Sequence, residues 1–525
     1  MRDRAGYDGF ITRPILQIYL HIGRIIILLL PAPFHKGIAM KLSSRHHEQK
    51  LLEHIYKSKR PEFLALYGRR RVGKTFLIKA FFETKECVFF HVTGIKDGSL
   101  TEQLEHFVKV TSITFHKGSE IKARTRWIDA FDGLTDAIQK HAESHQKIIL
   151  FFDEFPWMAV PKSKLLQALD HYWNHYWSND VRIKLVICGS SASWIINKII
   201  NNHGGLHNRI TQRILLKPYT LSETKKFLSQ QGVKLSHRQI TQIYMLTGGI
   251  PFYLSFVKKG RSSAQVIENL VFSENAPLLK EFDNLFSSLF EDPEPYIDLL
   301  RIIAKNRYGV AQTEIAEKSK YFTRGGHISE KLKELDETGF IIEFVPHQHK
   351  KKGVYYRVID EYVLFYLYWI EPIRKKLQKV FVPEGYWQTL QAKASWHSWS
   401  GYAFEAIIYK HLGPVRKKLH IPVTAIADSW RYFPMNKDQA GAQIDLLFDR
   451  DDDMITLCEI KFSVKPFVID KKYAVELIRK QSVFVKKTRT KKQIMISMIT
   501  AEGLSDTLYA DDLIQGVVTL DDLFL

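Results

Sequence analysis

Two glycines and a Lys-Thr pair occur at the spacing that binds nucleotide phosphates. Gly68 is followed after four residues by Gly73, Lys74 and Thr75. The glycines allow a tight loop whose backbone N–H groups point inward, toward phosphate oxygens. The lysine would reach the β- and γ-phosphates, and the threonine hydroxyl would bind Mg²⁺. The loop predicted to hold ATP consists of Gly68, Arg69, Arg70, Arg71, Val72, Gly73, Lys74 and Thr75.

A Mg²⁺ ion at such a loop needs a second carboxylate from a neighbouring strand. The segment "KIILFFDEFPWM" supplies one, because the apolar residues 148–152 precede Asp153 and Glu154. At the carboxyl end of this strand, Asp153 would hold Mg²⁺ through water and Glu154 would orient the attacking water. The alternative is an exposed turn that follows a core strand.

The flanking segments predict the elements that position the loop. Residues 63–67 form an apolar strand, and a helix begins at about residue 74, so that its N-terminal dipole faces the anion. In "IKLVICGSSASWI", another buried strand ends at Ser190 and Ser191, which either sense the γ-phosphate or only form a turn. Strands that alternate with helices predict a parallel sheet, with the nucleotide at the carboxyl ends of the strands.

A second group of residues could hold a cation for phosphodiester hydrolysis. In "LCEIKFS", Glu459 and Lys461 point to the same face of a strand; a surface salt bridge is the alternative. Asp445, in "AQIDLLF", could share one Mg²⁺ with Glu459, and the carbonyl of Ile460 would be a further ligand. Glu405 would assist from a preceding helix. Lys461 would position the attacking water or stabilise the developing negative charge.

The segments around these carboxylates follow a defined order. "WHSWSGYAFEAIIYKHL" predicts a helix, three strands follow, and a basic helix over 470–487 precedes the strand "QIMISMI". This order, with its carboxylate–x(n)–carboxylate–x–lysine pattern, resembles the core of the PD-(D/E)XK nuclease fold. The nearby "KKTRTKK", 486–492, would suit a phosphate backbone, or it forms a solvated helix end.

The middle of the chain has an order of helices and strands that is typical of a winged helix. Between residues 293 and 360, amphipathic helices precede two strands, "FIIEFV" and "VYYRVI", joined by the basic stretch "PHQHKKKG". Such a module either contacts DNA or serves as a packing adaptor. The residues expected to face a groove or to meet phosphates are Arg324, His327, Lys331, Lys333, Lys350, Lys351 and Lys352.

Five stretches, in order, carry a family resemblance: "YGRRRVGKT", "DEFPWM", "CGSSASW", "RILLKPYTLSE" and "TGGIPFYL". They resemble the archaeal ATPase family, a group of prokaryotic AAA-type ATPases within the signal-transducing (STAND-like) P-loop NTPases. The resemblance implies an ATPase core with a helical lid, a winged helix and a carboxyl-terminal nuclease-like domain. Arg209 and Arg213 fall near the family's arginine before the "LKP" turn, so the resemblance implies that one of them touches the γ-phosphate; a structural ion pair is the alternative for each.

The composition favours a polyanionic partner. The chain has 76 Lys and Arg residues against 56 Asp and Glu, a formal charge of +20. Nucleic acid, DNA more than RNA, is the expected partner, and a generally basic proteome or solubility is the alternative. The three cysteines show no CxxC spacing, which argues against a disulfide scaffold or a thiolate zinc site and fits a reducing cytoplasm.

The first 39 residues require separate treatment. Their uninterrupted apolar run, "IIILLLPAPF", is shorter than the ~20 residues of a membrane-spanning helix. We expect Met40 to be the working start and the preceding residues to be an extension; a signal peptide and a weak amphipathic membrane contact are the alternatives. No stable membrane insertion is expected.

The predicted fold class is α/β: a P-loop parallel sheet with a helical lid, a winged helix and a carboxyl-terminal restriction-endonuclease-like domain. The chain length suggests several domains. The predicted divisions are an extension (1–39), the ATPase core (40–217), the lid (218–290), the winged helix (291–370), a linker (371–395) and the nuclease-like domain (396–525).

Three functions are compatible with these residues. In the first, ATP binding orders the lid and winged helix, and the carboxyl-terminal site cleaves DNA with Mg²⁺. In the second, ATP turnover drives a regulatory switch and the nuclease fold only binds. The third is a membrane-tethered ATPase that uses residues 15–30. The sequence leaves the oligomeric state open.

Overall fold

The computed structural model describes residues 44–525, without 144, 202–205, 207, 323–326, 348–352, 380–382, 433 and 435–440. The predictions for residues 1–39, for Arg324 and for the lysines at 350–352 lie outside the described residues. Residues 42–525 form one compact unit. Within the described residues, none of the helices combines the length and the apolar composition that crossing a membrane requires.

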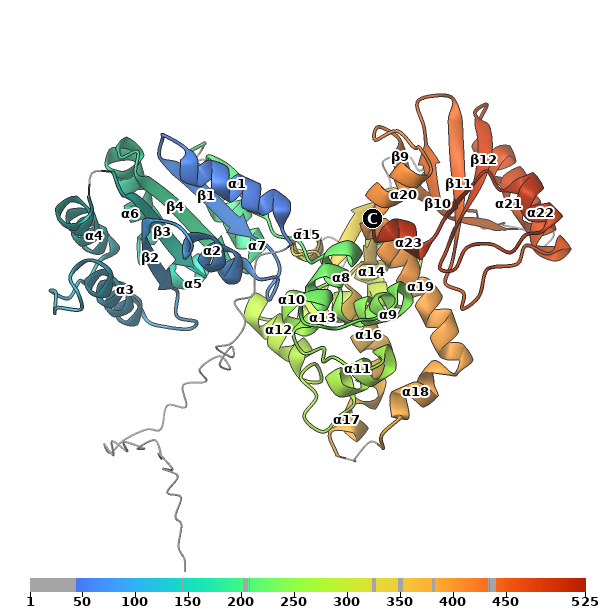
Figure 1. Ribbon diagram of the computed structural model, residues 1–525, viewed down its shortest axis with the longest axis horizontal. Coiled ribbons are helices and arrows are strands. Elements are labelled where there is room, and N and C mark those ends of the chain that lie inside the picture. Colours follow the sequence, from blue (N-terminus) through green and yellow to red (C-terminus); the bar gives the residue numbers. More distant parts are fainter. Residues whose placement is uncertain are drawn as a thin grey trace, which may run out of the picture. The chain divides into compact units, whose positions relative to one another are not determined.

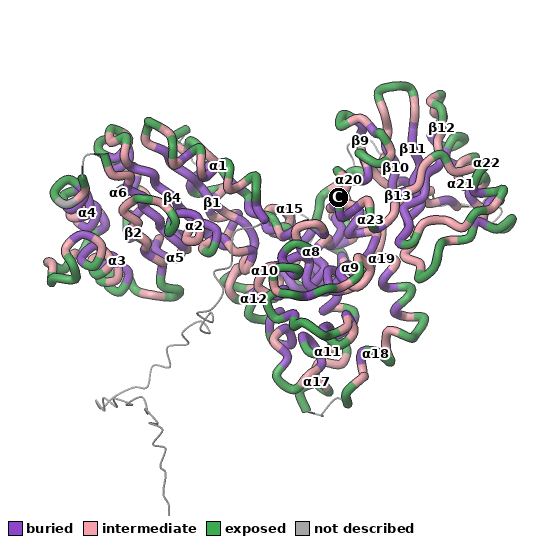
Figure 2. Tube along the Cα trace, viewed as in Figure 1, coloured by how far each residue is buried: buried purple, intermediate pink, exposed green. Residues whose placement is uncertain are grey.

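A five-stranded parallel sheet organises the first domain, in the order β2-β3-β4-β1-β5 (Figure 1). The central strands are mostly apolar, as expected for strands that helices cover on both faces. Buried positions run along β1 and β4 in Figure 2. The predicted α/β class with a parallel central sheet is confirmed. Its strands are β1 (Glu62–Tyr67), β2 (Cys87–Thr93), β3 (Lys147–Asp153), β4 (Ile183–Gly189) and β5 (Gln212–Leu215). Its helices are α1 (His46–Lys57), α2 (Lys74–Phe82), α3 (Leu100–Phe115), α4 (Trp127–His141), α5 (Phe155–Met158), α6 (Leu165–His175) and α7 (Ala192–Ile195), with the short η1 (Trp177–Asn179) and η2 (Ile196–Ile200).

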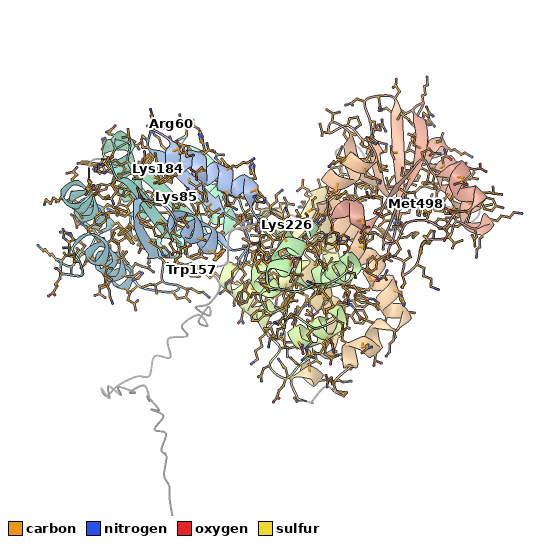
Figure 3. The ribbon with its side chains drawn as sticks, viewed as in Figure 1. Arg60, Lys85, Trp157, Lys184, Lys226 and Met498 are labelled. Carbon is orange, nitrogen blue, oxygen red and sulfur yellow. The ribbon has the colours of Figure 1, made fainter. Side chains whose placement is uncertain are left out.

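A buried lysine fixes the end of this sheet opposite the phosphate-binding loop. Lys184, near the start of β4, donates to the carbonyl oxygens of Ser58 (3.1 Å) and Arg60 in the connection that leads into β1 (Figure 3). Burial lowers the pKa of Lys184 to about 8. Lys184 therefore links β4 to the segment before β1 at the amino ends of these two strands. The phosphate-binding loop lies at the opposite end, where the strands have their carboxyl ends.

Residues 218–290, the predicted lid, contain five helices. Thr220, Ser236 and Ser262 each begin a helix with a capping box, which satisfies the first backbone N–H groups. Gly249 has φ +70°, and a Cβ there would lie 2.1 Å from the Tyr219 carbonyl oxygen, so the turn before α10 requires glycine. The helices are α8 (Leu221–Gln230), α9 (His237–Thr247), α10 (Pro251–Leu254), α11 (Ser263–Val271) and α12 (Glu281–Leu289).

The region 291–370 contains the three helices and two strands expected from the sequence, and also β6, α16 and η3, which were not predicted. Ile328, Leu332 and Leu335 form the buried stripe of α15. Strands β6, β8 and β7 make a small antiparallel sheet in that order. The elements are α13 (Glu294–Ala304), β6 (Val310–Ala311), α14 (Gln312–Lys318), α15 (Ile328–Glu337), β7 (Ile341–Phe344), β8 (Tyr355–Val358), α16 (Glu361–Phe365) and η3 (Tyr366–Ile370).

The segment predicted as a linker, 371–395, is largely helical. It contains η4 (Glu371–Ile373), α17 (Arg374–Leu377) and α18 (Tyr386–Gln391). Trp387 of α18 is fully buried, with ring centroids 5.2 Å from Trp369 and 5.3 Å from Trp396. Aromatic packing orders this segment, and its polar composition gave no sign of that.

A mixed sheet in the order β13-β12-β11-β10-β9 forms the last domain. Strands β9, β10 and β11 are antiparallel, whereas β11, β12 and β13 are parallel. The predicted helices and strands are present, and the sequence missed α20, α22, β13 and α23. The elements are α19 (Ala394–Lys410), α20 (Leu412–Lys418), β9 (Ile426–Tyr432), β10 (Ala442–Asp449), β11 (Met454–Lys461), α21 (Lys471–Thr488), β12 (Gln493–Thr500), α22 (Leu508–Leu513), β13 (Gly516–Val518) and α23 (Leu520–Leu523).

Candidate functional sites

The Gly68–Thr75 loop joins β1 to the amino terminus of α2. Gly68 has φ +143°, and a Cβ there would lie 2.4 Å from the Leu216 carbonyl oxygen. Gly73 has φ +90° at the N-cap of α2, and no atom other than those of Gly73 itself and its two chain neighbours lies within 4 Å of the place of its missing Cβ. The backbone of both residues therefore needs glycine, and the loop keeps open space at the helix terminus for an anion.

Lys74 and Thr75 are both held by polar groups at the base of this loop. The Lys74 side chain is buried, and its Nζ donates to the carbonyl oxygens of Gly68 (2.9 Å) and Arg69 (3.1 Å). Thr75 Oγ1 donates to Asp153 Oδ2 at 2.8 Å, although β4 lies between β1 and β3 in the sheet. The structure thus brings together the lysine, the hydroxyl and the carboxylate that the sequence predicts. Oxygen donors of this kind fit Mg²⁺.

Two further residues support the carboxylates at the end of β3. His91 of β2 has its Nε2 3.5 Å from Asp153 Oδ2. Burial alone would raise the pKa of Asp153, but hydrogen bonds with His91 and Thr75 outweigh it and hold the pKa below its ordinary value. Glu154, with φ +45°, accepts hydrogen bonds at Oε2 from Ser190 N (3.0 Å) and Oγ (2.9 Å). Ser190 therefore orients Glu154 in this structure.

The side chains of the loop arginines point to other parts of the chain. Arg69 forms a buried ion pair with Asp360, which directly precedes α16. Arg71 Nη2 lies 2.9 Å from Glu281 Oε2 of α12. Arg70 Nη1 donates to a carbonyl oxygen of α12 at 3.0 Å. Any contact of these three residues with phosphate would therefore come from their backbone N–H groups. Val72 is buried, and Arg209 and Arg213 have exposed side chains.

In the last domain, a break in strand pairing creates a second site. The pairing of β10 with β11 runs from Asp449–Ile455 to Leu446–Cys458, and β10 bulges against β9 between Ile444 and Leu447. Asp445 lies in that bulge. Its Oδ2 accepts a hydrogen bond from Ile460 N at 3.1 Å, and its Oδ1 accepts one from Gln443 at 3.1 Å. Bulges of this kind re-aim side chains next to active sites.

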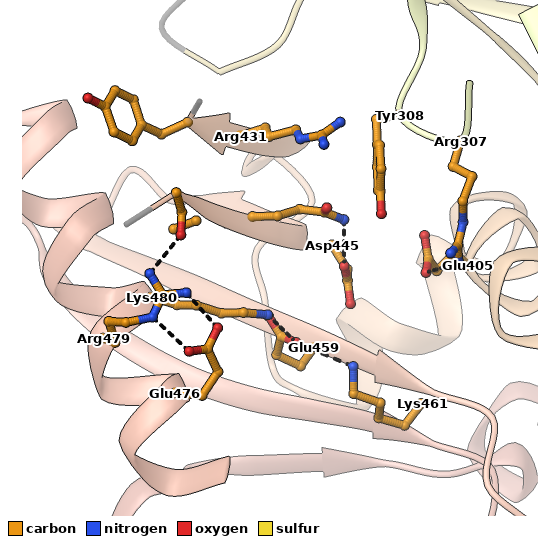
Figure 4. A pocket seen from close by; sticks show the side chains of 14 residues that line it. Arg307, Tyr308, Glu405, Arg431, Asp445, Glu459, Lys461, Glu476, Arg479 and Lys480 are labelled. Carbon is orange, nitrogen blue, oxygen red and sulfur yellow. Dashed lines mark hydrogen bonds and ion pairs between the residues drawn. The ribbon is translucent and has the colours of Figure 1, made fainter. Parts of the chain in front are cut away.

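Glu405, Asp445, Glu459 and Lys461 line one cavity of about 460 Å³ (Figure 4). Helix α19 supplies Glu405, β10 supplies Asp445, and β11 supplies the other two. Arg307 Nη2 reaches the cavity from the connection before β6 and lies 3.6 Å from Glu405 Oε1. The structure thus brings together all four residues that the sequence predicts for this site. The remaining lining residues are Tyr308, Arg431, Tyr432, Gly441, Ala442, Gln443, Glu476, Arg479 and Lys480.

The buried carboxylates of this cavity repel one another. Burial and the Asp445 carboxylate raise the pKa of Glu405 to about 8, against the effect of Arg307. The same two causes raise the pKa of Glu459, which Lys480 and Lys461 oppose. A divalent cation between these hard oxygen donors would relieve the repulsion of Asp445 with Glu405 and Glu459, so the three carboxylates fit the chemistry of Mg²⁺. Within the described residues, no three side chains of His, Cys, Asp and Glu are grouped closely enough to hold an ion by themselves.

Comparison with known proteins identifies the first domain. Residues 42–257 match the profile of an ATPase domain found predominantly in Archaea. They are a P-loop ATPase domain of this family. One relative matches over more than the length of the ATPase domain: an uncharacterized protein of Methanocaldococcus jannaschii is 26% identical over 425 residues, 80% of this chain and 87% of the relative. An uncharacterized ATP-binding protein of the same organism is 46% identical over 50 residues, 10% of this chain and 83% of the relative. Among solved structures, the Walker-type ATPase of Pyrococcus abyssi is 18% identical with a TM-score of 0.45, covering 63% of this chain and 99% of that chain.

Sequence reasoning missed several side chains of both sites. In the ATPase domain it missed His91, whose position beside Asp153 follows from the pairing of β2 with β3. In the last domain it missed Lys480 and Tyr473, both hydrogen-bonded to Glu459. The spacing of Tyr473 and Lys480, seven residues apart on α21, was a signal that they share one helix face. Arg307 could not be found in this way, because it comes from another region of the chain.

The raised pKa of Glu405 predicts a pH-dependent stability when no divalent cation is present. The folded chain keeps a proton on Glu405 up to about pH 8, whereas the unfolded chain releases it near its ordinary pKa of 4.5. Folding therefore binds a proton between these values, and stability falls as the pH rises through this window. We expect Glu405→Gln to raise the melting temperature by a few °C at pH 8.5, and by less at pH 5, in thermal unfolding with EDTA.

The matched control for this measurement is Glu476→Gln. Glu476 lines the same cavity, but its hydrogen bond to Arg479 lowers its pKa, so it is already ionised throughout the window. Its replacement should leave the slope of melting temperature against pH unchanged between pH 5 and 8.5. An equal change of slope in both variants would contradict the assignment to Glu405.

Proposed function

We propose that this ATPase acts on nucleic acid and that its carboxyl-terminal domain cleaves DNA with Mg²⁺. The observation that carries the proposal is the convergence of Glu405, Asp445, Glu459 and Lys461 on one cavity. The cavity has three carboxylates beside a lysine, and the pKa is raised at two of them, Glu405 and Glu459. Such a group suits a hard divalent cation and a phosphodiester. The arrangement of helix, strands and cavity supports a PD-(D/E)XK nuclease fold for residues 396–525.

Each residue of the cavity would have a separate task. A bound Mg²⁺ would lower the pKa of a water molecule and stabilise the charge that develops on the phosphate. Asp445 and Glu459 would hold the ion, with the Ile460 carbonyl as a further ligand. Glu405 would assist directly or through water, and Lys461 would orient the attacking water or the phosphate.

The ATPase domain would supply the energy-dependent step. Lys74 would bind the β- and γ-phosphates of ATP, and Thr75 and Asp153 would hold Mg²⁺. Glu154 would orient the attacking water once it leaves Ser190. Residues 291–370, proposed to be a winged helix, would contact DNA through His327, Lys331 and Lys333. The formal charge of +20 supports a polyanionic partner.

The test is a cleavage assay on the purified full chain. Supercoiled and linear DNA are incubated with Mg²⁺ or EDTA, with and without ATP. We expect cutting that needs the metal, disappears in Asp445→Asn and persists in Asp449→Asn, whose carboxylate on the same strand pairs with Lys492 at 2.7 Å. Cutting by the Asp445→Asn chain at the wild-type rate would assign it to a contaminant or another site.

A regulatory switch is the second candidate, and specific contacts favour it. Asp360 pairs with Arg69 of the ATP-binding loop, and its neighbour Glu361 accepts a hydrogen bond from Lys410 Nζ at 2.6 Å. Lys410 lies on α19, the helix that also carries Glu405. ATP turnover could thus change the conformation around α19 without any cleavage. ATP hydrolysis that depends on Lys74, with no cutting of any DNA, would support this function.

A further inference from the structure

Glu459 has a closer cationic partner than the lysine of its own strand. Lys480 Nζ of α21 donates to Glu459 Oε1 at 2.7 Å and to Oε2 at 2.8 Å, whereas Lys461 Nζ lies 3.5 Å from Oε2 (Figure 4). The Glu459 side chain is 4% exposed and that of Lys480 is 17% exposed. A buried carboxylate without a partner is costly, so Lys480 stabilises Glu459 when no cation is present.

The surroundings of Lys480 distinguish it from the other cation on the same helix turn. Arg479 pairs with Glu476 through Nη2 at 2.6 Å and donates to the Gly441 carbonyl oxygen at 2.6 Å. Its charge is therefore neutralised by Glu476, another lining residue of the cavity. Lys480 instead places its charge against the predicted metal ligand. Helix α21 thus carries two neighbouring cations with different partners: Lys480 contacts Glu459, the predicted metal ligand, and Arg479 contacts Glu476.

A divalent cation and the Lys480 ammonium group cannot both bind the Glu459 carboxylate in the arrangement that the structure shows. Both carboxylate oxygens already accept from the ammonium group, and a cation between Asp445 and Glu459 would lie a few ångströms from that like charge. Binding of the cation would therefore require the ammonium group to leave at least one oxygen. The space into which it can move is the cavity that both side chains line.

We propose that Lys480 is the counter-ion of Glu459 until a divalent cation binds, and that the cation then frees its ammonium group to contact a phosphate of the nucleic-acid strand. The proposal rests on the proposed function. A lysine suits such an exchange because its charge is compact and its four-carbon stem is flexible. Lys480 would thus position Glu459 when no divalent cation is bound, and it would contact a phosphate when one is bound.

Cation affinity is the first test, because removal of a competitor should tighten binding. Mn²⁺ titration of the full chain at pH 8.5, followed by calorimetry, should give an affinity about tenfold higher for Lys480→Met than for the wild type. Arg479→Met removes the same charge one residue away and should change the affinity much less. Lys480→Gln, which keeps a hydrogen-bond donor, is measured in parallel in case the methionine variant unfolds. An unchanged or weaker Mn²⁺ affinity in a folded Lys480 variant would overturn the proposal.

DNA affinity tests the second half of the exchange. In Ca²⁺, which occupies oxygen sites, Lys480→Met should bind DNA several-fold more weakly than the wild type. In EDTA the two chains should bind DNA equally, because Lys480 is then held by Glu459. An equal loss of affinity in both conditions would make Lys480 an ordinary surface contact and contradict the exchange.

Lysine labelling of the wild-type chain requires no substitution. Acetylation followed by peptide mass spectrometry should label Lys480 faster in Mg²⁺ than in EDTA, whereas the exposed Lys471 and Lys472 of the same helix should react equally in both. Faster labelling and tighter Mn²⁺ binding without DNA cleavage would support the exchange and reject the nuclease. DNA cleavage together with equal labelling of Lys480 in Mg²⁺ and in EDTA would support the nuclease and reject the exchange.

Discussion

Replacing Lys74 with alanine should lower the rate of ATP hydrolysis by about a hundredfold or more. The Lys74 ammonium group is buried and held by the carbonyl oxygens of Gly68 and Arg69, so no bulk solvent replaces its charge at the phosphates. Removing one preorganised donor from a site of this kind costs about 10²–10³ in rate. Phosphate release by the purified full chain measures the effect.

Two matched variants separate binding from chemistry in this experiment. Lys79→Ala removes a lysine from the same helix, away from the loop, and should leave hydrolysis close to the wild-type rate. Glu154→Gln should still bind a fluorescent ATP analogue but hydrolyse ATP slowly, because a glutamine oxygen can accept the hydrogen bonds from Ser190 without acting as a base. Hydrolysis that survives in Lys74→Ala would contradict the assignment of the loop.

The residues of the ATP-binding loop could be predicted because their functions impose local rules. The loop needs positive φ angles at positions 68 and 73, which glycine adopts without strain. The apolar run before Asp153 is what a buried parallel strand requires. The directions of the Arg69 and Arg71 side chains do not follow from such rules. Their partners, Asp360 and Glu281, lie more than 200 residues along the chain, and no local pattern links them.

The carboxyl-terminal site shows the same division between local and distant information. The order of elements and the Asp445–Glu459–Lys461 spacing were visible, since strand alternation fixes which side chains share a face. Lys480 depends on how α21 packs against the sheet, and Arg307 depends on how another region meets α19. The helical segment 371–395 was missed because tertiary aromatic contacts, centred on Trp387, override weak local propensity.

The ion pair between Arg69 and Asp360 leads to the second large prediction. Both side chains are almost fully buried, and the Arg69 guanidinium also lies over the Phe340 ring, 5.1 Å from its centroid. Removing one partner of a buried pair leaves an uncompensated charge and costs about 3–5 kcal/mol. We expect Asp360→Ala to lose stability in this range, measured as the free energy of unfolding in urea. Asp360→Asn keeps the N-cap hydrogen bond to Val363 N and should lose slightly less.

A double substitution shows whether the charge or the packing causes this loss. In Arg69→Met/Asp360→Leu neither charge remains, and apolar side chains of similar size occupy the space. Most of the stability should therefore return, so the two single losses should not add. The pair of Arg374 and Asp283 is the control: the Asp283 side chain is 53% exposed, so Asp283→Ala should cost less than about 1 kcal/mol. If Asp360→Asn were as mild as Asp283→Ala, solvent would have to reach Arg69 in solution. The Arg69 side chain would then be available to ATP, and its ion pair with Asp360 would contribute little to holding the ATP-binding loop against the start of α16.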